Sequence, residues 1–88
     1  MKIKNGFVLR RVMDNYVVVA VGEASKSFRG MLKLNATAAE VWQGIEKGLS
    51  ESQICDVLCE KYDVEPSVAI CDVKKTVEEL FSHGFAEE

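Results

Sequence analysis

The sequence predicts a single α+β domain, residues 1–88, in which a three-stranded antiparallel sheet is followed by a bundle of three helices. β-rich runs fill much of the first 34 residues, and apolar residues at helical spacing fill most of the remainder. A length of 88 residues allows one hydrophobic core, and 48% hydrophobic with 28% charged residues is the composition of a globular domain. No apolar run approaches the roughly 18 residues that a membrane-spanning helix needs.

The first two strands are expected at residues 7–13 and 16–21. Asp14 and Asn15 between them tolerate the positive φ of a tight hairpin turn. The second run, Tyr-Val-Val-Val-Ala-Val, does not alternate apolar with polar residues, so we expect a strand that is central or covered on both faces. A polar loop follows, and Gly30 then gives backbone freedom before a short third strand at Met31–Leu34.

The first helix follows this strand directly. Asn35 suits its N-cap because the side-chain oxygen can accept from free N–H groups of the first turn, and Gly48 suits the left-handed position after its end. Its expected core face consists of Ala38, Val41, Trp42 and Ile45. Trp42 is interpreted as a core residue rather than a ligand contact.

Two more helices complete the domain. Ser50, with Gln53 three residues later, forms a capping-box pattern that begins the second helix. Pro66 suits the first position of the third helix, where its missing N–H costs nothing, and Gly84 ends that helix. Phe85-Ala86 is then expected to trail off as a wing. The inward stripes are Ile54, Val57, Leu58 and Tyr62 on the second helix, and Ile70, Val73, Val77, Leu80 and Phe81 on the third.

Charge and cysteine content narrow the classes of partner and cofactor. The chain has 14 acidic against 11 basic side chains, a net charge of −3, which disfavours nucleic acid as a partner. Three cysteines are an odd number and fall in expected helices, which favours reduced thiols and a cytoplasmic location. Cys55 and Cys59 share an i, i+4 spacing that could bind a metal with Cys71 or His83. No paired ligand motif supports such a site, so small buried hydrophobes are the simpler interpretation.

Three helices beside a small sheet resemble a winged helix-turn-helix domain, and several short motifs narrow the resemblance. These motifs are Leu34-Asn35, Thr37-Ala38-Ala39, Val41-Trp42, Tyr62-Asp63-Val64, Asp72-Val73, Leu80 and Gly84-Phe85. Together, from about Tyr16 to Phe85, they resemble the PqqD-like proteins, the peptide-recognition elements of pathways that modify ribosomally made peptides, including pyrroloquinoline quinone (PQQ) biosynthesis. Gly44 in the first helix and Cys71 before Asp72 are variations that leave the resemblance intact.

The resemblance implies a domain with no catalytic residues and no cofactor. In that family the domain binds the leader segment of a precursor peptide as an added strand against the third β-strand, beside the third helix. It then presents the peptide to a modifying enzyme, often a radical S-adenosylmethionine protein. The expected partners are therefore a leader peptide and such an enzyme, without a membrane or nucleic acid.

The sequence also names the residues that would hold such a peptide. An unpaired edge at Gly30, Met31, Leu32, Lys33 and Leu34 would offer main-chain groups to an extended peptide. On the third helix, Ala69, Asp72 and Thr76 form a flank of short side chains, and the core residue Val73 beside them is also expected to contact the peptide. Two roles stay open at this point: Asp72 could bind a basic leader residue or remain solvated, and Met31 could meet the leader or fill the core. Lys33 could meet leader side chains on the outer face.

Other uses of the same features remain open. A winged-helix DNA binder would read DNA with residues 68–81, but that helix carries Lys74 and Lys75 against Asp72, Glu78 and Glu79. An enzyme would need a nucleophile with a base, a phosphate loop or metal-ligand spacing, and the sequence shows none of them. A homodimer through Met31–Leu34 would also satisfy the strand edge and would compete with the leader.

Overall fold

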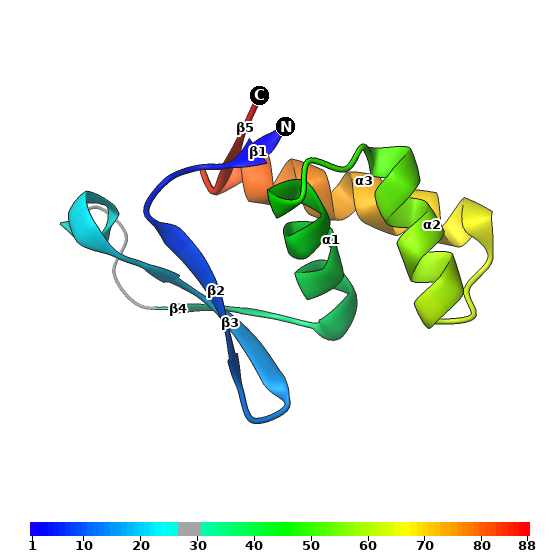
Figure 1. Cartoon of the computed structure of the whole chain (residues 1–88), viewed down its shortest axis with the longest axis horizontal. Coiled ribbons are helices and arrows are strands. Elements are labelled where there is room, and N and C mark those ends of the chain that lie inside the picture. Colours follow the sequence, from blue (N-terminus) through cyan, green and yellow to red (C-terminus); the bar gives the residue numbers. More distant parts are fainter. Residues whose placement is uncertain (27–30) are drawn as a thin grey trace.

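The computed structural model describes residues 1–26 and 31–88. The strands are β1 (Lys2–Ile3), β2 (Phe7–Val12), β3 (Asn15–Ala20), β4 (Met31–Leu34) and β5 (Ala86–Glu87). A short 3-10 helix, η1 (Gly22–Lys26), follows β3, and the α-helices are α1 (Ala36–Glu46), α2 (Glu51–Lys61) and α3 (Pro66–Ser82). Figure 1 shows the larger sheet on one side of the molecule and the three helices on the other. The predicted α+β fold, a three-stranded antiparallel sheet followed by three helices, is confirmed.

β2, β3 and β4 form an antiparallel sheet in that order, so β3 is its central strand, as the unbroken apolar run predicted. The hairpin turn lies one residue earlier than predicted, because Val12 pairs with Asn15 and leaves Met13-Asp14 as the two turn residues. A turn at the predicted place would have set Phe7 opposite a residue beyond the end of β3. Met13 takes φ +57°, a value that the first position of a type II′ turn requires and glycine usually supplies.

The capping residues act as predicted. Asn35 Oδ1 accepts the N–H three residues later at 2.8 Å, at the start of α1. Ser50 and Gln53 form both bonds of the capping box, at 3.2 and 2.9 Å. Gly48 and Gly84 each take φ +80° after α1 and α3. These local contacts satisfy main-chain groups that a helix end would otherwise leave without partners.

The two ends of the chain form a second antiparallel pair that the sequence analysis did not predict. Lys2 lies opposite Glu87 and Ile3 opposite Ala86, so the termini meet beside α1 and α3 (Figure 1). The expectation that Phe85-Ala86 trails off as a wing is wrong. Phe85 is fully buried, and its ring centroid lies 4.9 Å from that of Phe7. Burial of a phenylalanine side chain is favoured in free energy over its exposure at a wing, and β1 supplies main-chain partners for Ala86 and Glu87.

One hydrophobic core joins the helices to the inner face of the larger sheet. Its most buried members come from every layer: Val18 of β3, Val41, Trp42 and Ile45 of α1, Ile54 and Leu58 of α2, Ala69, Val73 and Leu80 of α3, and Phe85. The interpretation of Trp42 as a core residue is confirmed. Leu32 and Leu34 of β4 pack against this core, so β4 is held in place by its inward-facing side chains.

Candidate functional site

The direction of the main-chain groups in β3 follows from one hydrogen bond beyond the end of the hairpin. The N–H of Val21 donates to the C=O of Gly6 at 2.7 Å, across the β2–β3 pair. Bonded and non-bonded pairs alternate along antiparallel strands. The next bonded pair along β3 is therefore that of Val19 with β2, and the main-chain groups of Val18 and Tyr16 face β4.

β4 consequently presents an open edge. The β4 residues opposite Val18 and Tyr16 are Leu32 and Leu34, so these two bond to β3. The N–H and C=O groups of Met31 and Lys33 point the other way, toward the outer edge of the sheet, where no other strand of residues 1–26 and 31–88 pairs with them. An extended peptide laid along β4 would complete these bonds.

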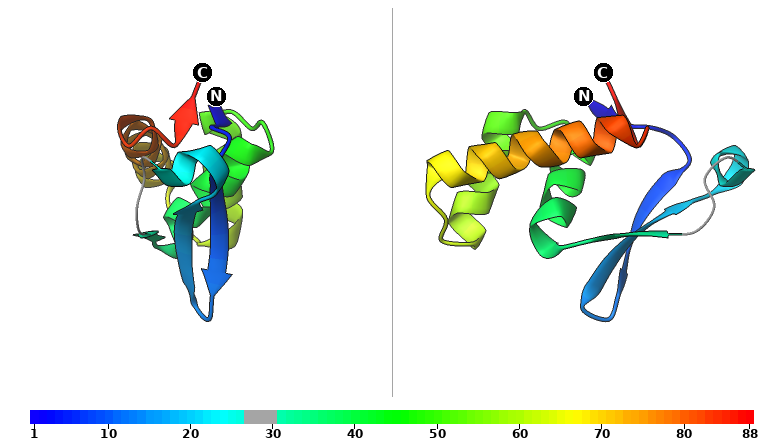
Figure 2. Two further views of the ribbon diagram at one scale, coloured as in Figure 1. Left: turned by 90° about the vertical axis from the view of Figure 1, so that its left-hand side faces the viewer. Right: turned by 180° about the vertical axis from the view of Figure 1, so that it is seen from behind.

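A polar hollow of about 250 Å³ lies between the first turn of α1 and the face of α3. α1 and the residue before it contribute Asn35, Thr37 and Ala38, and α3 contributes Asp72, Lys75, Thr76 and Glu79. Asn35 follows Leu34 directly, so the hollow begins where β4 ends. The left view of Figure 2 shows β4 and α3 on the same side of the molecule. A strand added to β4 would therefore reach this hollow at one of its ends.

Some of the residues expected on α3 line the hollow, and others are buried beneath it. Asp72 is exposed and Thr76 half-buried, and both line the hollow. Ala69 and Val73 are 1% and 0% exposed. The expectations that Ala69 lies on an open flank and that Val73 contacts the peptide are therefore wrong, because the close packing of α3 on α1 and α2 covers both residues. Gly30 lies outside the described residues.

Several residues of the hollow were not predicted as part of a site. Asn35 was expected only as a helix cap, Thr37 only within a family motif, Ala38 on the core face of the first helix, and Lys75 only as a charge on the third helix. The hollow forms because α1 turns back from the end of β4 and lies against α3, and no sequence spacing specifies that approach. The only sequence signal for it is the strand-to-helix junction at Leu34-Asn35.

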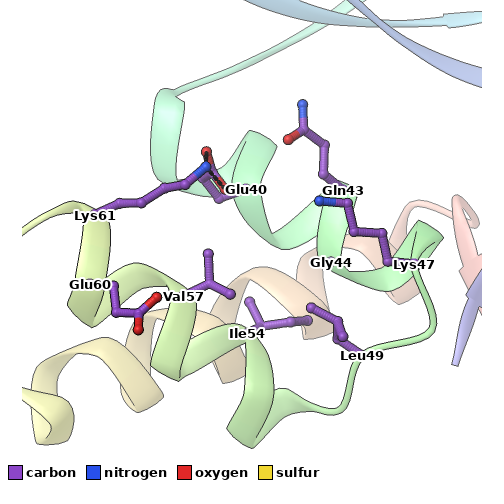
Figure 3. Close-up of a pocket in the computed structure, with 9 residues that line it drawn as sticks. All are labelled: Glu40, Gln43, Gly44, Lys47, Leu49, Ile54, Val57, Glu60 and Lys61. Atoms are coloured by element: carbon purple, nitrogen blue, oxygen red, sulfur yellow. Dashed lines mark hydrogen bonds and ion pairs between the residues drawn. The ribbon is translucent and has the colours of Figure 1, made fainter.

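A second hollow, also of about 250 Å³, lies between α1 and α2, with Gly44, Leu49, Ile54 and Val57 among its lining residues (Figure 3). At its rim Lys61 Nζ lies 3.1 Å from Glu40 Oε1 and joins the two helices. The hydrogen bond and the charge of Glu40 raise the pKa of Lys61 above its ordinary value of 10.5. This ion pair links α1 to α2 along one side of the hollow, so we interpret the hollow as part of the packing between the two helices.

The cysteines lie in three different environments. Cys55 is buried with its Sγ 3.7 Å from the C=O of Pro66, Cys59 is half-buried, and Cys71 is exposed. Burial, and then the hydrogen bond with Cys59, raise the pKa of Cys55, which disfavours its thiolate. The described residues contain no group of three His, Cys, Asp or Glu side chains that could bind a metal. None of the described helices is long and apolar enough to cross a membrane.

Comparison with solved structures finds the same fold in two chains, each 22% identical to this one over 99% of its length. The first, described as TbiB1 in complex with the TbiA(beta) leader peptide, has a TM-score of 0.80 over 95% of its own chain. The second, lasso peptide synthetase B1 complexed with the leader peptide, has a TM-score of 0.79 over 96% of its chain. A comparison with curated proteins gave no match. The family model of coenzyme PQQ synthesis protein D matches residues 15–86. With most of its length matched by that model, the chain belongs to the PqqD family.

Proposed function

We propose that this protein is a peptide-binding adaptor, which binds the leader segment of a ribosomally synthesised precursor as an added strand on β4, beside α3. It then presents the precursor to a modifying enzyme, for which a radical S-adenosylmethionine protein is the favoured class. Two solved chains of the same fold are described as complexes with leader peptides, which supports this role. The proposed setting is cytoplasmic, where the exposed thiol of Cys71 would remain reduced.

The open edge of β4 is the observation that carries the proposal. Met31 and Lys33 together turn two N–H and two C=O groups outward, and an edge strand with unpaired groups is a template for another extended chain. Leu32 and Leu34 pack β4 against the core, which holds the template in place for the peptide. A template held in place by packing loses less conformational entropy on binding than a free segment, which favours affinity.

Selectivity would come from side chains at the end of the edge. Main-chain pairing is the same for any sequence, whereas the hollow between α1 and α3 offers specific polar groups. Asp72 and Thr76 are the proposed contacts there, with Asp72 available to accept from a polar or basic leader residue. Ala69 and Val73 would act from beneath, by keeping the face of α3 in position.

Substitution of Lys33 tests strand addition directly. Lys33→Pro removes one outward N–H, whereas Lys33→Ala removes the same charged side chain and keeps the N–H. Proline is tolerated on an edge strand when its missing N–H faces away from the sheet, so both variants should fold. One net hydrogen bond of about 0.5–1.5 kcal/mol makes the proline variant bind the leader roughly 2- to 13-fold more weakly than the alanine variant.

The binding measurement is calorimetry with a synthetic leader peptide from the precursor encoded beside this chain. Amide chemical shifts recorded in the same titration should change along β4 and α3 and remain constant in α2. Equal affinities for Lys33→Pro and Lys33→Ala, with both variants folded, would show that no peptide pairs with this edge. The absence of any shift change with the encoded precursor would remove the adaptor role itself.

A further inference from the structure

The larger sheet has an outer face that none of the helices α1, α2 and α3 covers. Side chains alternate along a strand, and Phe7, Leu9, Val18, Leu32 and Leu34 point into or pack on the core. The intervening residues therefore point to the other side. We call six of them the outer sheet face: Val8, Arg10, Val12, Val17, Val19 and Lys33. Asn15, opposite Val12 at the hairpin tip, lies on the same side.

This face is apolar at its centre. Val17 and Val19 lie on the central strand and are half-buried, but among the described residues neither they nor Val8 pack against the core. Val12, near the hairpin tip, is 53% exposed. The unbroken valine run of β3 predicted a strand that is central or covered on both faces. Residues 1–26 and 31–88 provide the central position and cover only the inner face, so the other face is open to a partner.

Charge indicates what kind of partner fits. The registers place Val17 directly between Arg10 of β2 and Lys33 of β4, and both cations are exposed. None of the six residues of the outer sheet face is acidic, although the whole chain carries a net charge of −3. A second copy on this face would bring Arg10 and Lys33 against the same cations, which disfavours self-association. The negative whole-chain charge likewise disfavours nucleic acid and anionic membranes.

We propose that the outer sheet face docks the modifying enzyme, through an apolar patch on that enzyme flanked by carboxylates. The assignment rests on the proposed function, because the enzyme is the partner to which an adaptor must deliver its peptide. A leader strand added to β4 would lie next to Lys33, and every second leader side chain would point to this same face. The enzyme would then contact the adaptor and the bound leader together, so each should strengthen the binding of the other.

Charge reversal on opposite faces of one strand tests the assignment. Arg10→Glu alters the outer sheet face, and Arg11→Glu makes the same change of charge one residue along, on the opposite face. Val17→Thr adds a hydroxyl to the apolar centre and keeps a β-branched side chain. The probe is the purified modifying enzyme encoded beside this chain, and its affinity is measured with and without the leader peptide.

We expect Arg10→Glu to weaken enzyme binding by about tenfold or more and Val17→Thr to weaken it by a few-fold. Arg11→Glu should stay within about twofold of the unchanged protein, and all three variants should keep its leader affinity. The leader should also tighten enzyme binding to the unchanged protein.

Four results would overturn the assignment. In the first, Arg10→Glu leaves enzyme affinity unchanged; in the second, the unchanged protein binds the leader but not the enzyme. In the third, Arg10→Glu and Arg11→Glu lower enzyme affinity equally. In the fourth, the protein binds phosphatidylserine vesicles instead of the enzyme, and that binding depends on Arg10. Failure of the unchanged protein to bind the leader would overturn the adaptor role, and this assignment with it.

Discussion

Replacing Gly44 by alanine should destabilise the protein, although alanine is the better helix former. A Cβ on Gly44 would lie 2.6 Å from Ile54 Cγ1 and 3.0 Å from Ile54 Cδ1, and Ile54 is 1% exposed with Cγ1 held close to its own main chain. Overpacking of this kind costs roughly 2–3 kcal/mol, whereas the higher helix propensity of alanine returns about 1 kcal/mol. We expect the free energy of unfolding to fall by roughly 1–2 kcal/mol.

The sign of this effect should depend on Ile54. Ile54→Ala removes Cγ1 and Cδ1 and keeps Cβ, which would lie at an ordinary 3.6 Å from the new methyl group. In that background Gly44→Ala should stabilise by about 1 kcal/mol, through helix propensity alone. Ile54→Val is the matched control, because valine keeps a carbon at the Cγ1 position and should leave Gly44→Ala destabilising.

Urea unfolding of the double-mutant cycle, followed by circular dichroism, gives the four free energies. An equal effect of Gly44→Ala in the unchanged and Ile54→Ala backgrounds would refute the packing argument. Stabilisation by Gly44→Ala in the unchanged background would refute it as well.

Three further measurements test a turn, an ion pair and the thiols. Met13→Gly should raise the free energy of unfolding by about 1 kcal/mol, because glycine adopts φ +57° without strain, and a decrease in urea unfolding would contradict a strained turn. The raised pKa of Lys61 means that its pair with Glu40 stabilises the fold below pH 10.5, and that this contribution is lost as the pH rises through the raised value. Glu40→Gln should therefore be less stable than the unchanged protein at pH 8, and the difference should disappear in strong alkali; a constant difference would exclude the ion pair as its cause. Cys71, which is exposed, should react promptly with a thiol reagent, and buried Cys55 only as the protein unfolds. Prompt modification of Cys55 would show that α2 opens readily.

The helix boundaries could be predicted because their causes are local. Asn35, Ser50 and Gln53 cap helices through bonds to residues within three positions, so the sequence shows both partners. The position of the hairpin turn was less certain, because two adjacent residue pairs could each form it. Pairing with the whole of β3 selected Met13-Asp14 and placed a methionine at a strained φ.

Contacts between distant segments could not be predicted in the same way. The burial of Phe85 depended on the pairing of the residues after it with β1, which lies at the other end of the chain and is only two residues long. The burial of Ala69 depended on how closely α3 approaches its neighbours, and alanine suits a core and a surface equally well. Gly44 showed no local role because its partner, Ile54, belongs to the next helix.

The sequence alone determined the order of strands and helices, the caps, the central place of β3 and the resemblance to the PqqD family, since these depend on residue type and spacing along the chain. Tertiary structure decided which groups of β4 face outward, where the polar hollow forms and which sheet face stays uncovered. The physical reason is that a strand edge, a hollow and an open face are each defined by the segments that pack beside them and the segments that do not. That arrangement depends on packing among elements far apart in the chain.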